Sequence, residues 1–476
     1  MLQENKINLK DFEEKIYSLI CQYGRELYKQ ILHDWDSELH KNRDRSIYRD
    51  KGKRKTVLKT VMGEVEYERH VYTYKDENGK SGTVYLLDEA IGKPESGYFS
   101  EALMLRIASA VCEMPYRKAA TEISALTGQC ISHTAAWNVV QQLGERIDEI
   151  EESNADKASL NKGVGEIESK LLFEEMDGIY LHLQGKAREE HGKGCEMKLA
   201  IAYDGFEETR KKEDKDKKSK KRFELTNKVA CANFENTIDF HRRREGVIAS
   251  FYNVDEIEIR VQNTDGASWA KNDGADGVIH QLDPYHRNRA IVRATSNETY
   301  RKNMLELLYT KEIDLLLKYI EALIIAEKDE KNKGAIESLH KYFSNNKESL
   351  ISYKRRGIKL PAPPEGKEYR NMGAMESNVF SIIGNRMKSR RKCWSIEGGN
   401  NLARLLCLKA TNKLDETLLK IADVLPEKYA EEVIVGFSSA KTQVSVGKGY
   451  DGFDAITIPT SQRWFKEIAK IKPIYS

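Results

Sequence analysis

The stretch SKLLFEEMDGIYLHLQG, residues 169–185, places a carboxylate inside a segment that otherwise predicts a buried β-strand. Aspartate is depleted in strands, and an unpaired buried carboxylate is costly. Because side chains alternate along a strand, Asp177 shares a face with Phe173, Ile179 and Leu181, where packing residues are expected. Asp177 is therefore the first candidate for a functional residue.

The segments that follow this strand predict a series of further strands. Further strands are expected at residues 195–208, 222–234, 256–266 and 276–283, with a helix at 240–252 and another between the last two strands. The order β-β-β-α-β-α-β indicates an α/β core, or α+β for the chain as a whole. In a sheet ordered 3-2-1-4-5, the first and fourth strands are neighbours, so carboxylates on them can converge.

Two further acidic residues complete a candidate metal site with Asp177. Asp265 ends the fourth strand before Gly266, and Glu376 opens a helix after the proline-rich stretch 360–366. Each has an ordinary alternative, a turn for Asp265 and Gly266 and a surface or first-turn glutamate for Glu376. Three converging carboxylates repel one another unless a cation neutralises them. Oxygen ligands of this kind suit Mg²⁺ or Mn²⁺.

A polar pair follows the fifth strand in HQLDPYHRNRAI, residues 280–291. Asp283 and His286 stand three positions apart. One interpretation places them beside the active site, where they position substrate or a catalytic water. The alternative is a helix-capping aspartate and a surface histidine.

Residues 115–144 have the pattern of a helix-turn-helix. One helix is expected from Tyr116 to Leu126, the TGQ at 127–129 breaks it, and a second helix runs to Leu143. Any helical hairpin has the same pattern. If the segment binds DNA, the exposed start of the second helix supplies the contacts, namely Ser132, His133, Thr134, Trp137 and Asn138.

Basic residues are concentrated in NRMKSRRK, residues 385–392, although the net charge of the chain is only +3. A helix face of this kind can hold phosphates, and Trp394 beside it can stack on a base. The alternatives are a solvated helix end and a packed tryptophan. The candidate DNA-binding residues here are Arg386, Lys388, Arg390, Arg391 and Trp394.

The four motifs together resemble the ISLre-type insertion-sequence transposases, relatives of the Mutator-like bacterial transposases. The residues that carry the resemblance are FEEMDGIYLHL, VQNTDGASWAK, LDPYHRNRAI and GAMESNVFSIIGNRMKSRRKCWS. The resemblance covers nearly the whole chain and implies an RNase H-like fold with a helical insertion before the last acid. It implies that Asp177, Asp265 and Glu376 form a metal-binding DDE triad, and Asp283 to His286 resembles the C/D-x-x-H signature of the Mutator-like group.

This resemblance assigns a region to each part of the chain. We expect an N-terminal helix and small β-sheet at 1–98, a helix-turn-helix at 99–148, the first part of the RNase H-like core at 149–297, a helical insertion at 298–369, the last acid and C-terminal helices at 370–430, and a tail at 431–476. A length of 476 residues fits several domains.

The mechanism implied by the resemblance is metal-dependent cleavage of DNA at the end of the element, followed by attack of the freed 3′-OH on target DNA. The implied partners are DNA and further copies of the chain. Two rivals remain, another RNase H-like DNA nuclease and a non-catalytic helix-turn-helix regulator whose acids are structural. A catalytically dead copy is a third reading. Glu365 and Glu368 are the nearby alternatives to Glu376, although they precede the helix rather than lie on it.

Compartment is predicted from the cysteines and the apolar runs. The seven cysteines are widely spaced and include no C-x-x-C, which favours reduced thiols. The polar N-terminal sequence does not resemble a signal peptide, and no run of about 18 apolar residues predicts a membrane span. We therefore expect a cytoplasmic, nucleoid-associated protein.

Overall fold

The computed structural model describes residues 9–75, 79–91, 99–163, 165–209, 222–270, 277–389 and 392–422. The chain divides into two units. Unit 1 comprises Met1–Arg25, Lys59–Glu64 and Phe99–Leu418, and unit 2 comprises Glu26–Leu58, Val65–Tyr98 and Leu419–Ser476. The predicted tail at 431–476 lies outside the described residues.

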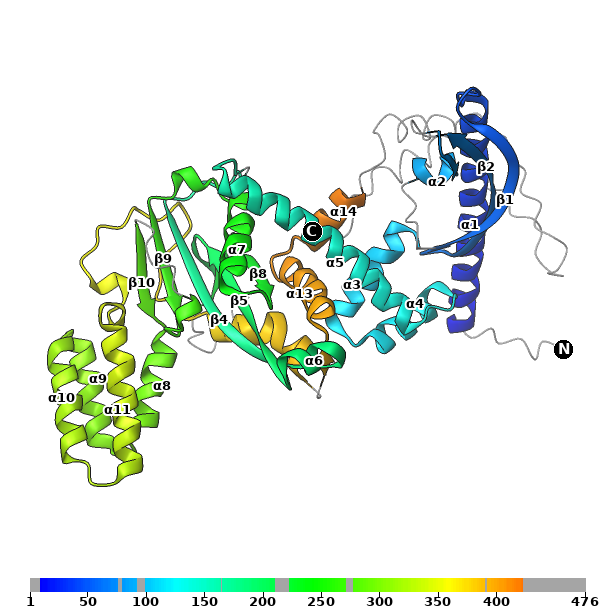
Figure 1. The fold of residues 1–476 in the computed structure, drawn as a ribbon. Coiled ribbons are helices and arrows are strands. Elements are labelled where there is room, and N and C mark those ends of the chain that lie inside the picture. Colours follow the sequence, from blue (N-terminus) through cyan, green and yellow to red (C-terminus); the bar gives the residue numbers. More distant parts are fainter. Residues whose placement is uncertain are drawn as a thin grey trace. The chain divides into compact units, whose positions relative to one another are not determined.

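The centre of unit 1 is a mixed sheet with the strand order β10-β9-β4-β5-β8 (Figure 1). β4 pairs antiparallel with β5 and parallel with β9, β9 is parallel to β10, and β5 is antiparallel to β8. In chain order this is the predicted arrangement 3-2-1-4-5. The strands are β4 (Leu171–Leu183), β5 (Gly194–Tyr203), β8 (Val229–Asn233), β9 (Ile259–Thr264), β10 (Val278–Leu282) and the short β11 (Cys393–Trp394), which pairs with β4.

Two of the predicted strands are divided in the structure. The segment predicted at 195–208 ends as β5 at Tyr203 and restarts as β6 (Gly205–Thr209), and the segment at 222–234 begins as β7 (Arg222–Thr226). β6 and β7 form a separate antiparallel pair. The break coincides with Asp204, whose buried carboxylate accepts hydrogen bonds from β7 and the residue that follows it.

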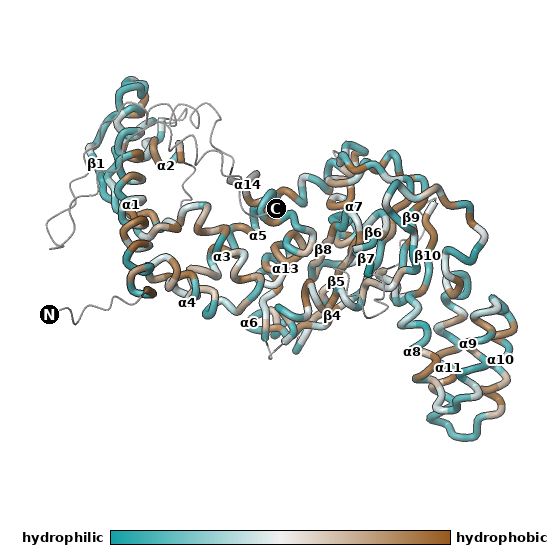
Figure 2. Tube along the Cα trace, turned by 180° about the vertical axis from the view of Figure 1, so that it is seen from behind, coloured by the Kyte–Doolittle hydropathy of each residue, from teal (hydrophilic) through white to brown (hydrophobic). Residues whose placement is uncertain are grey.

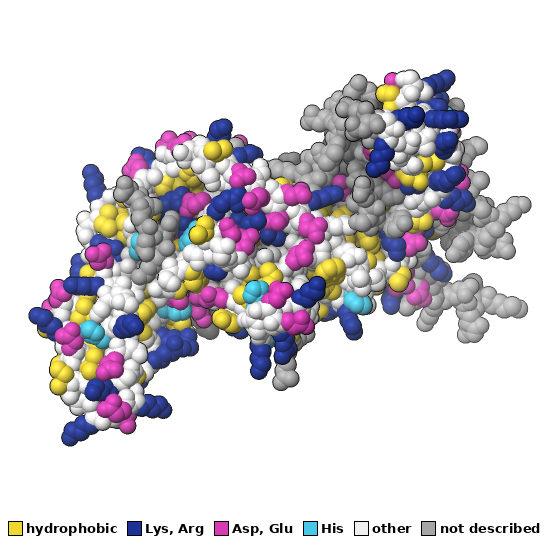
Figure 3. Space-filling view, in the orientation of Figure 1, with side chains coloured by type: hydrophobic (Ala, Val, Ile, Leu, Met, Phe, Trp, Pro, Cys, Tyr) yellow, Lys and Arg dark blue, Asp and Glu magenta, His cyan; other side chains and the backbone are white. Residues whose placement is uncertain are grey.

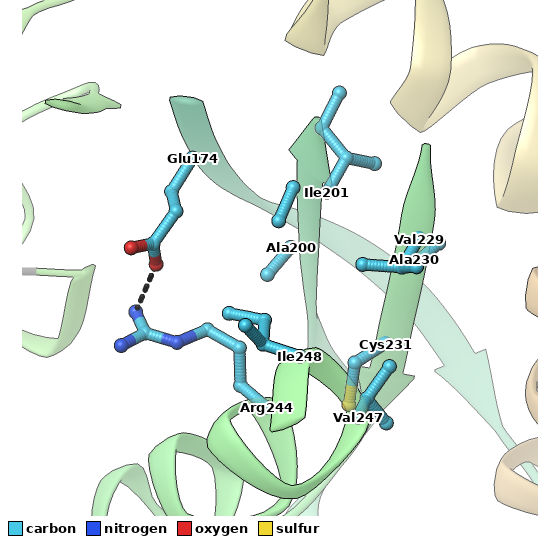
Figure 4. A pocket seen from close by; sticks show the side chains of 10 residues that line it. Glu174, Ala200, Ile201, Val229, Ala230, Cys231, Arg244, Val247 and Ile248 are labelled. Atoms are coloured by element: carbon cyan, nitrogen blue, oxygen red, sulfur yellow. Dashed lines mark ion pairs between the residues drawn. The ribbon is translucent and has the colours of Figure 1, made fainter. Parts of the chain in front are cut away.

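Helix α7 (Thr237–Phe251) covers one face of the sheet. Its apolar residues pack with Leu172, Met176 and other inward-facing strand residues. Glu174 of β4 points to the same face and lies 3.5 Å from the Arg244 guanidinium of α7, with both side chains almost fully buried (Figure 4). Because the ion pair is buried, the loss of either partner would leave an uncompensated charge.

The opposite face of β4 packs against α12 (Met375–Asn378) and the π-helix η5 (Val379–Lys388). Phe173 lies in an aromatic cluster with Tyr203 and Tyr353 on this face, with ring centroids 5.4 and 5.5 Å away. The predicted helix after the prolines is therefore present, but its continuation is π-helical. π-helical segments are rare and are frequently found at functional sites.

The sequence immediately before the sheet forms the helices α3 (Glu101–Glu113), α4 (Tyr116–Thr127) and α5 (His133–Ser159). The sequence after the sheet forms α13 (Ile396–Ala410) and α14 (Leu414–Ala422). α4 ends at Gly128, which has a left-handed backbone with φ of 64°. The prediction that the next helix ends at Leu143 is wrong, because α5 runs on to Ser159. Gly144 lies inside α5, where a Cβ atom would approach Asn401 of α13 to 2.4 Å.

Ion pairs fasten α5 to the sheet-bearing part of unit 1. The Asp148 carboxylate lies 2.6 Å from the Arg243 guanidinium of α7 and 2.5 Å from that of Arg404 in α13. Asp148 is the last residue of the predicted helix-turn-helix region. In the structure it lies inside the continuous helix α5 and pairs with arginines of α7 and α13.

Four helices, α8 (Pro284–Ala294), α9 (Glu298–Thr310), α10 (Ile313–Ala326) and α11 (Glu330–Asn345), lie on the β10 side of the sheet. Hydrophobic and hydrophilic residues alternate along α9 to α11 (Figure 2), and buried residues such as Leu316 and Phe343 form a core of their own. Acidic and basic side chains are intermixed on the visible surface of these helices (Figure 3). The 3₁₀ turns η3 (Lys347–Leu350) and η4 (Tyr353–Arg355) follow.

The helix predicted after Asp265 is reduced, among the described residues, to the 3₁₀ turn η2 (Ser268–Ala270). Residues 271–276 lie outside the described part of the chain. Two short elements complete unit 1, α6 (Gly185–His191) after β4 and the 3₁₀ turn η1 (Val254–Glu256) before β9.

Unit 2 contains the C-terminal part of α1 (Leu9–Asn42), the three-stranded sheet β1-β2-β3 and α2 (Leu86–Ala90). The strands are β1 (Arg49–Thr60), β2 (Gly63–Lys75) and β3 (Ser81–Val84). The helix and small β-sheet expected within residues 1–98 are present, and β3 is followed by the short helix α2. Across both units, none of the described helices has the length and apolar character that a bilayer crossing requires.

Candidate active site

The register of the parallel strands aligns three aspartates. Met176 of β4, Thr264 of β9 and Leu282 of β10 are partners across the sheet. The residues that follow them are Asp177, Asp265 and Asp283. The strand pairing thus brings residues from distant parts of the sequence to one level of the sheet.

Asp177, His286 and Glu376 form a group of potential metal ligands. One ligand atom from each residue lies within 4.8 Å of those of the other two. His286 Nε2 lies 3.6 Å from Asp177 Oδ2, and interaction with this carboxylate is the main cause that raises the pKa of His286 above its usual value.

Asp265 lies next to this group. Burial, followed by the negative charge of Asp177, raises the pKa of Asp265, while the N–H of Ala267, 2.8 Å from Oδ1, and His286 oppose the shift. Among the described residues, the set of ligand atoms within 4.8 Å does not include Asp265. The third group within this distance is His286, whereas the resemblance implies Asp265.

Gly266 explains why the strand ends as it does. Its φ is +87°, and a Cβ atom there would lie 2.8 Å from Leu282 Cδ2 and 3.1 Å from Asn346 Oδ1. The Tyr342 hydroxyl of α11 donates to the carbonyl oxygen of Asp265 at 2.6 Å. The residues form a tight turn, which is the ordinary alternative considered for them, and the metal-site reading of Asp265 stays a prediction.

A fourth carboxylate, Glu196 of β5, was missed by sequence reasoning. Burial raises the pKa of Glu196, and the charges of Asp265 and Asp177 add to this effect while Lys198 opposes it. The Glu196 carboxylate lies over Gly178, where a Cβ atom would be only 2.2 Å from Oε1. The signal in the sequence was the glycine directly after Asp177, which leaves space for a side chain from the neighbouring strand.

Beneath the site lies a second carboxylate that was missed, Glu175. Its oxygens accept hydrogen bonds from the Tyr203 hydroxyl at 2.6 Å and the Asn263 amide at 2.9 Å. The N–H groups of residues 373–375 also donate to it, at 3.1 to 3.2 Å. Burial raises the pKa of Glu175. Glu175 thus holds the backbone that immediately precedes Glu376.

Asp283 acts as a helix cap, the alternative considered for it. Its Oδ1 accepts from the backbone N–H groups of Tyr285 and His286 at the start of α8, at 2.8 and 3.3 Å. Its Oδ2 accepts from the Asn263 amide at 2.8 Å, and the same amide donates to Glu175. Asp283 positions His286 and is not among the ligand atoms within 4.8 Å of one another in the described residues.

The start of α5 presents the side chains predicted to face DNA. Ser132 caps the helix by accepting from the N–H of Ala135 at 3.0 Å. All the residues of the predicted DNA-binding set are exposed, namely Ser132, His133, Thr134, Trp137 and Asn138.

The second predicted DNA-binding set is corrected in part. Arg386 is 5% exposed, and its Nε donates to the carbonyl of Val111 at 2.6 Å. Trp394 is also buried, and its Nε1 donates to the carbonyl of Met387 at 2.9 Å. The burial of both side chains contradicts the prediction that they contact DNA. Lys388 is exposed, and Arg390 and Arg391 lie outside the described residues.

The donor set at the acidic site fits a divalent cation. Ligand atoms of two carboxylates and an imidazole lie within 4.8 Å of one another, and burial, with a contribution from the charge of Asp177, raises the pKa values of the neighbouring Asp265 and Glu196. Such a set suits Mg²⁺ or Mn²⁺, and the imidazole favours Mn²⁺ among the two.

The fold and site define a mixed α/β protein with carboxylates and an imidazole gathered where parallel strands end. The chain belongs to the uncharacterised protein family UPF0236, which matches residues 2–417. Three UPF0236 proteins of Caldanaerobacter subterraneus subsp. tengcongensis are each 24% identical to it. The alignments cover 85%, 84% and 84% of this chain and 78%, 78% and 77% of the relatives, and the name of the first combines eleven locus tags.

Among solved structures, the Drosophila P element transposase strand transfer complex aligns with 75% of this chain and 90% of that chain. The identity is 11% and the TM-score is 0.20. A TM-score of this size does not establish a common fold.

Proposed function

We propose that this chain is a DDE-type transposase that cleaves DNA at the end of an insertion sequence and joins the end to target DNA. The observation that carries the proposal is the convergence of Asp177, Glu376 and His286 within 4.8 Å, with Asp265 beside them. These residues come from four separate places in the chain. Acids gathered in this way at strand ends suit phosphoryl transfer.

The strand order supports an RNase H-like core interrupted by a helical insertion. Within the proposal, β4, β5, β8, β9 and β10 are the five core strands, and α9 to α11 are the insertion between Asp265 and Glu376. The resemblance to ISLre-type and Mutator-like transposases belongs to the same proposal. The eleven locus tags of one relative fit a gene that occurs in many copies, as mobile elements do.

Asp177, Glu376 and Asp265 would hold the metal, with His286 as a further ligand or proton carrier. When bound, Mg²⁺ or Mn²⁺ would activate the attacking oxygen and stabilise the leaving oxygen. In the first step water attacks the phosphate at the element end, the bond to the 3′-oxygen breaks, and that oxygen leaves as the 3′-OH. In the second step this hydroxyl attacks a target phosphodiester and displaces its 3′-oxygen. His286, which lies 3.6 Å from Asp177, would bind a metal through its neutral form.

DNA binding is proposed for the exposed start of α5, where Ser132, His133 and Asn138 are accessible. Helix N-termini and neighbouring polar side chains commonly hold the phosphate backbone. Binding of two element ends would require more than one copy of the chain.

The test is a cleavage and strand-transfer assay on DNA that flanks the gene, with Mg²⁺ or Mn²⁺. Variants Asp177→Asn, Asp265→Ala and Glu376→Gln are compared with Glu365→Gln, an exposed acid before the helix. We expect each of the first three to lower the rate by about 10²- to 10⁴-fold while DNA binding persists, because a bound metal supplies several kcal/mol. Glu365→Gln should retain activity.

The outcomes separate the rivals. Cleavage without joining of the 3′-OH end would indicate another DNA nuclease. Sequence-specific binding without cleavage by the wild-type chain would favour the regulator. Full activity of Asp265→Ala with loss in Asp177→Asn and Glu376→Gln would remove Asp265 from the site and leave His286 in its place.

A further inference from the structure

We propose a second metal site, in unit 2, in which His40, His70 and Asp50 bind Zn²⁺. His40 lies in the last turn of α1, His70 in β2 and Asp50 near the start of β1. One ligand atom from each of the three residues lies within 4.8 Å of the other two. This site is separate from the carboxylates of unit 1 and does not depend on the function proposed for them.

The hydrogen bonds of His70 prepare it as a ligand. Its Nδ1 lies 2.6 Å from Oδ2 of Asp36, and its backbone N–H donates to Oδ1 of the same residue at 3.0 Å. Asp36 is only 2% exposed. Because a carboxylate can only accept, Nδ1 carries the hydrogen and the lone pair is on Nε2. A carboxylate that orients a histidine in this way is the usual partner of a metal-bound imidazole.

His40 is held in a similar way by the neighbouring strand. Its Nδ1 lies 3.1 Å from the Tyr72 hydroxyl, and its ring stacks on that of His70 with centroids 4.0 Å apart. Burial raises the pKa of Tyr72 to about 12, so the phenol keeps its proton at neutral pH. Burial, followed by the proximity of His70 and Arg43, lowers the pKa of His40.

The donor set indicates the class of metal. Two imidazoles and one carboxylate match the ligands of Zn²⁺ sites with three protein ligands, whereas Mg²⁺ and Ca²⁺ prefer oxygen alone. Asp50 is exposed, so solvent can fill a fourth position. Its Oδ1 also accepts from the N–H of Gly52 at 2.9 Å, which fixes the turn at this point of the strand. A bound ion would connect the end of α1 to both β1 and β2.

The experiment measures Zn²⁺ bound to the full-length chain after chelator treatment and equilibration with Zn²⁺ in excess Mg²⁺. His70→Ala and Asp50→Asn are compared with His33→Ala, which removes an exposed histidine of α1, the helix that carries His40. We expect His70→Ala and Asp50→Asn each to bind about one Zn²⁺ per chain fewer than His33→Ala. Asp36→Asn should weaken binding by about 10- to 100-fold, because it removes the group that orients His70.

The comparison is a difference between variants, so Zn²⁺ held by the acidic site of unit 1 cancels. Asp50→Asn keeps the oxygen that accepts from Gly52 and should fold even where His70→Ala does not, which circular dichroism checks. Co²⁺ substitution should give the visible absorption of a tetrahedral site in His33→Ala and not in Asp50→Asn. Equal Zn²⁺ content in Asp50→Asn and His33→Ala would overturn the proposal.

Discussion

Neighbouring residues of β4 have different tasks because successive side chains point to opposite faces. Glu174 pairs with Arg244 of α7 on one face. Glu175 and Asp177 share the other face, where Glu175 binds the backbone before α12 and Asp177 faces His286. The sequence FEEMDG therefore supplies one structural ion pair, one anchor and one site residue within a few positions.

Glu175→Ala should destabilise the protein strongly. The substitution leaves the Tyr203 hydroxyl, the Asn263 amide and the N–H groups of residues 373–375 without their acceptor in a buried region. We expect a loss of about 3–5 kcal/mol in the free energy of unfolding, measured by urea denaturation. Glu175→Gln keeps the volume and one acceptor oxygen, so its loss should be clearly smaller. A change below about 1 kcal/mol for Glu175→Ala would contradict this role.

At the scale of elements, close helix packing depends on a glycine that the sequence pattern treats as a helix end. Gly144 lies against the Cα and Cβ atoms of Asn401 in α13, so α5 and α13 can approach closely only where no side chain intervenes. Gly334 in α11 is the natural comparison, because a Cβ atom there would meet nothing within 4 Å.

Alanine at these two positions should have opposite effects. Gly334→Ala should raise the free energy of unfolding by about 0.5–1 kcal/mol, because alanine favours the helix. Gly144→Ala gains the same propensity but must push apart two helices, and we expect a net loss of about 1–3 kcal/mol. Thermal and urea unfolding of both variants checks the prediction. A gain in stability for Gly144→Ala comparable to that of Gly334→Ala would show that α5 and α13 adjust without cost.

At the scale of the whole molecule, the burial of the thiols follows the packing of the elements. Cys130 and Cys393 are exposed and Cys195 is half-buried, whereas Cys21, Cys112, Cys231 and Cys407 are buried. Burial raises the pKa of Cys112 to about 11 and that of Cys231 well above its usual value. A buried neutral thiol reacts slowly.

A thiol reagent should therefore distinguish the folded from the unfolded chain. We expect Cys130 and Cys393 to react fast in the native protein, Cys195 more slowly, and the buried four only after unfolding in guanidinium chloride. Peptide mapping after a short pulse identifies the labelled residues. Rapid native labelling of Cys231, which lies between the sheet and α7, would mean that the central sheet opens readily.

Local pattern was sufficient for most of the sheet and for the start of the candidate site. Strand positions and their order could be predicted, because alternation and β-branched residues reflect the backbone of each segment. The glycine after Asp265 could be assigned to a turn for the same reason. The prediction that α5 ends at Leu143 was wrong. A glycine also occurs inside a helix where close packing against a second helix leaves no space for a side chain, as at Gly144.

What the sequence by itself determined is the alternation that puts Asp177 among packing residues and the strand order that aligns it with Asp265. Only the tertiary structure decided which side chains meet there: His286 joins Asp177 and Glu376, Glu196 reaches across Gly178, and Arg386 is buried. The physical reason is the range of the interactions. Periodicity depends on neighbours in the chain, whereas burial, ion pairing and ligand geometry depend on residues that only folding brings together.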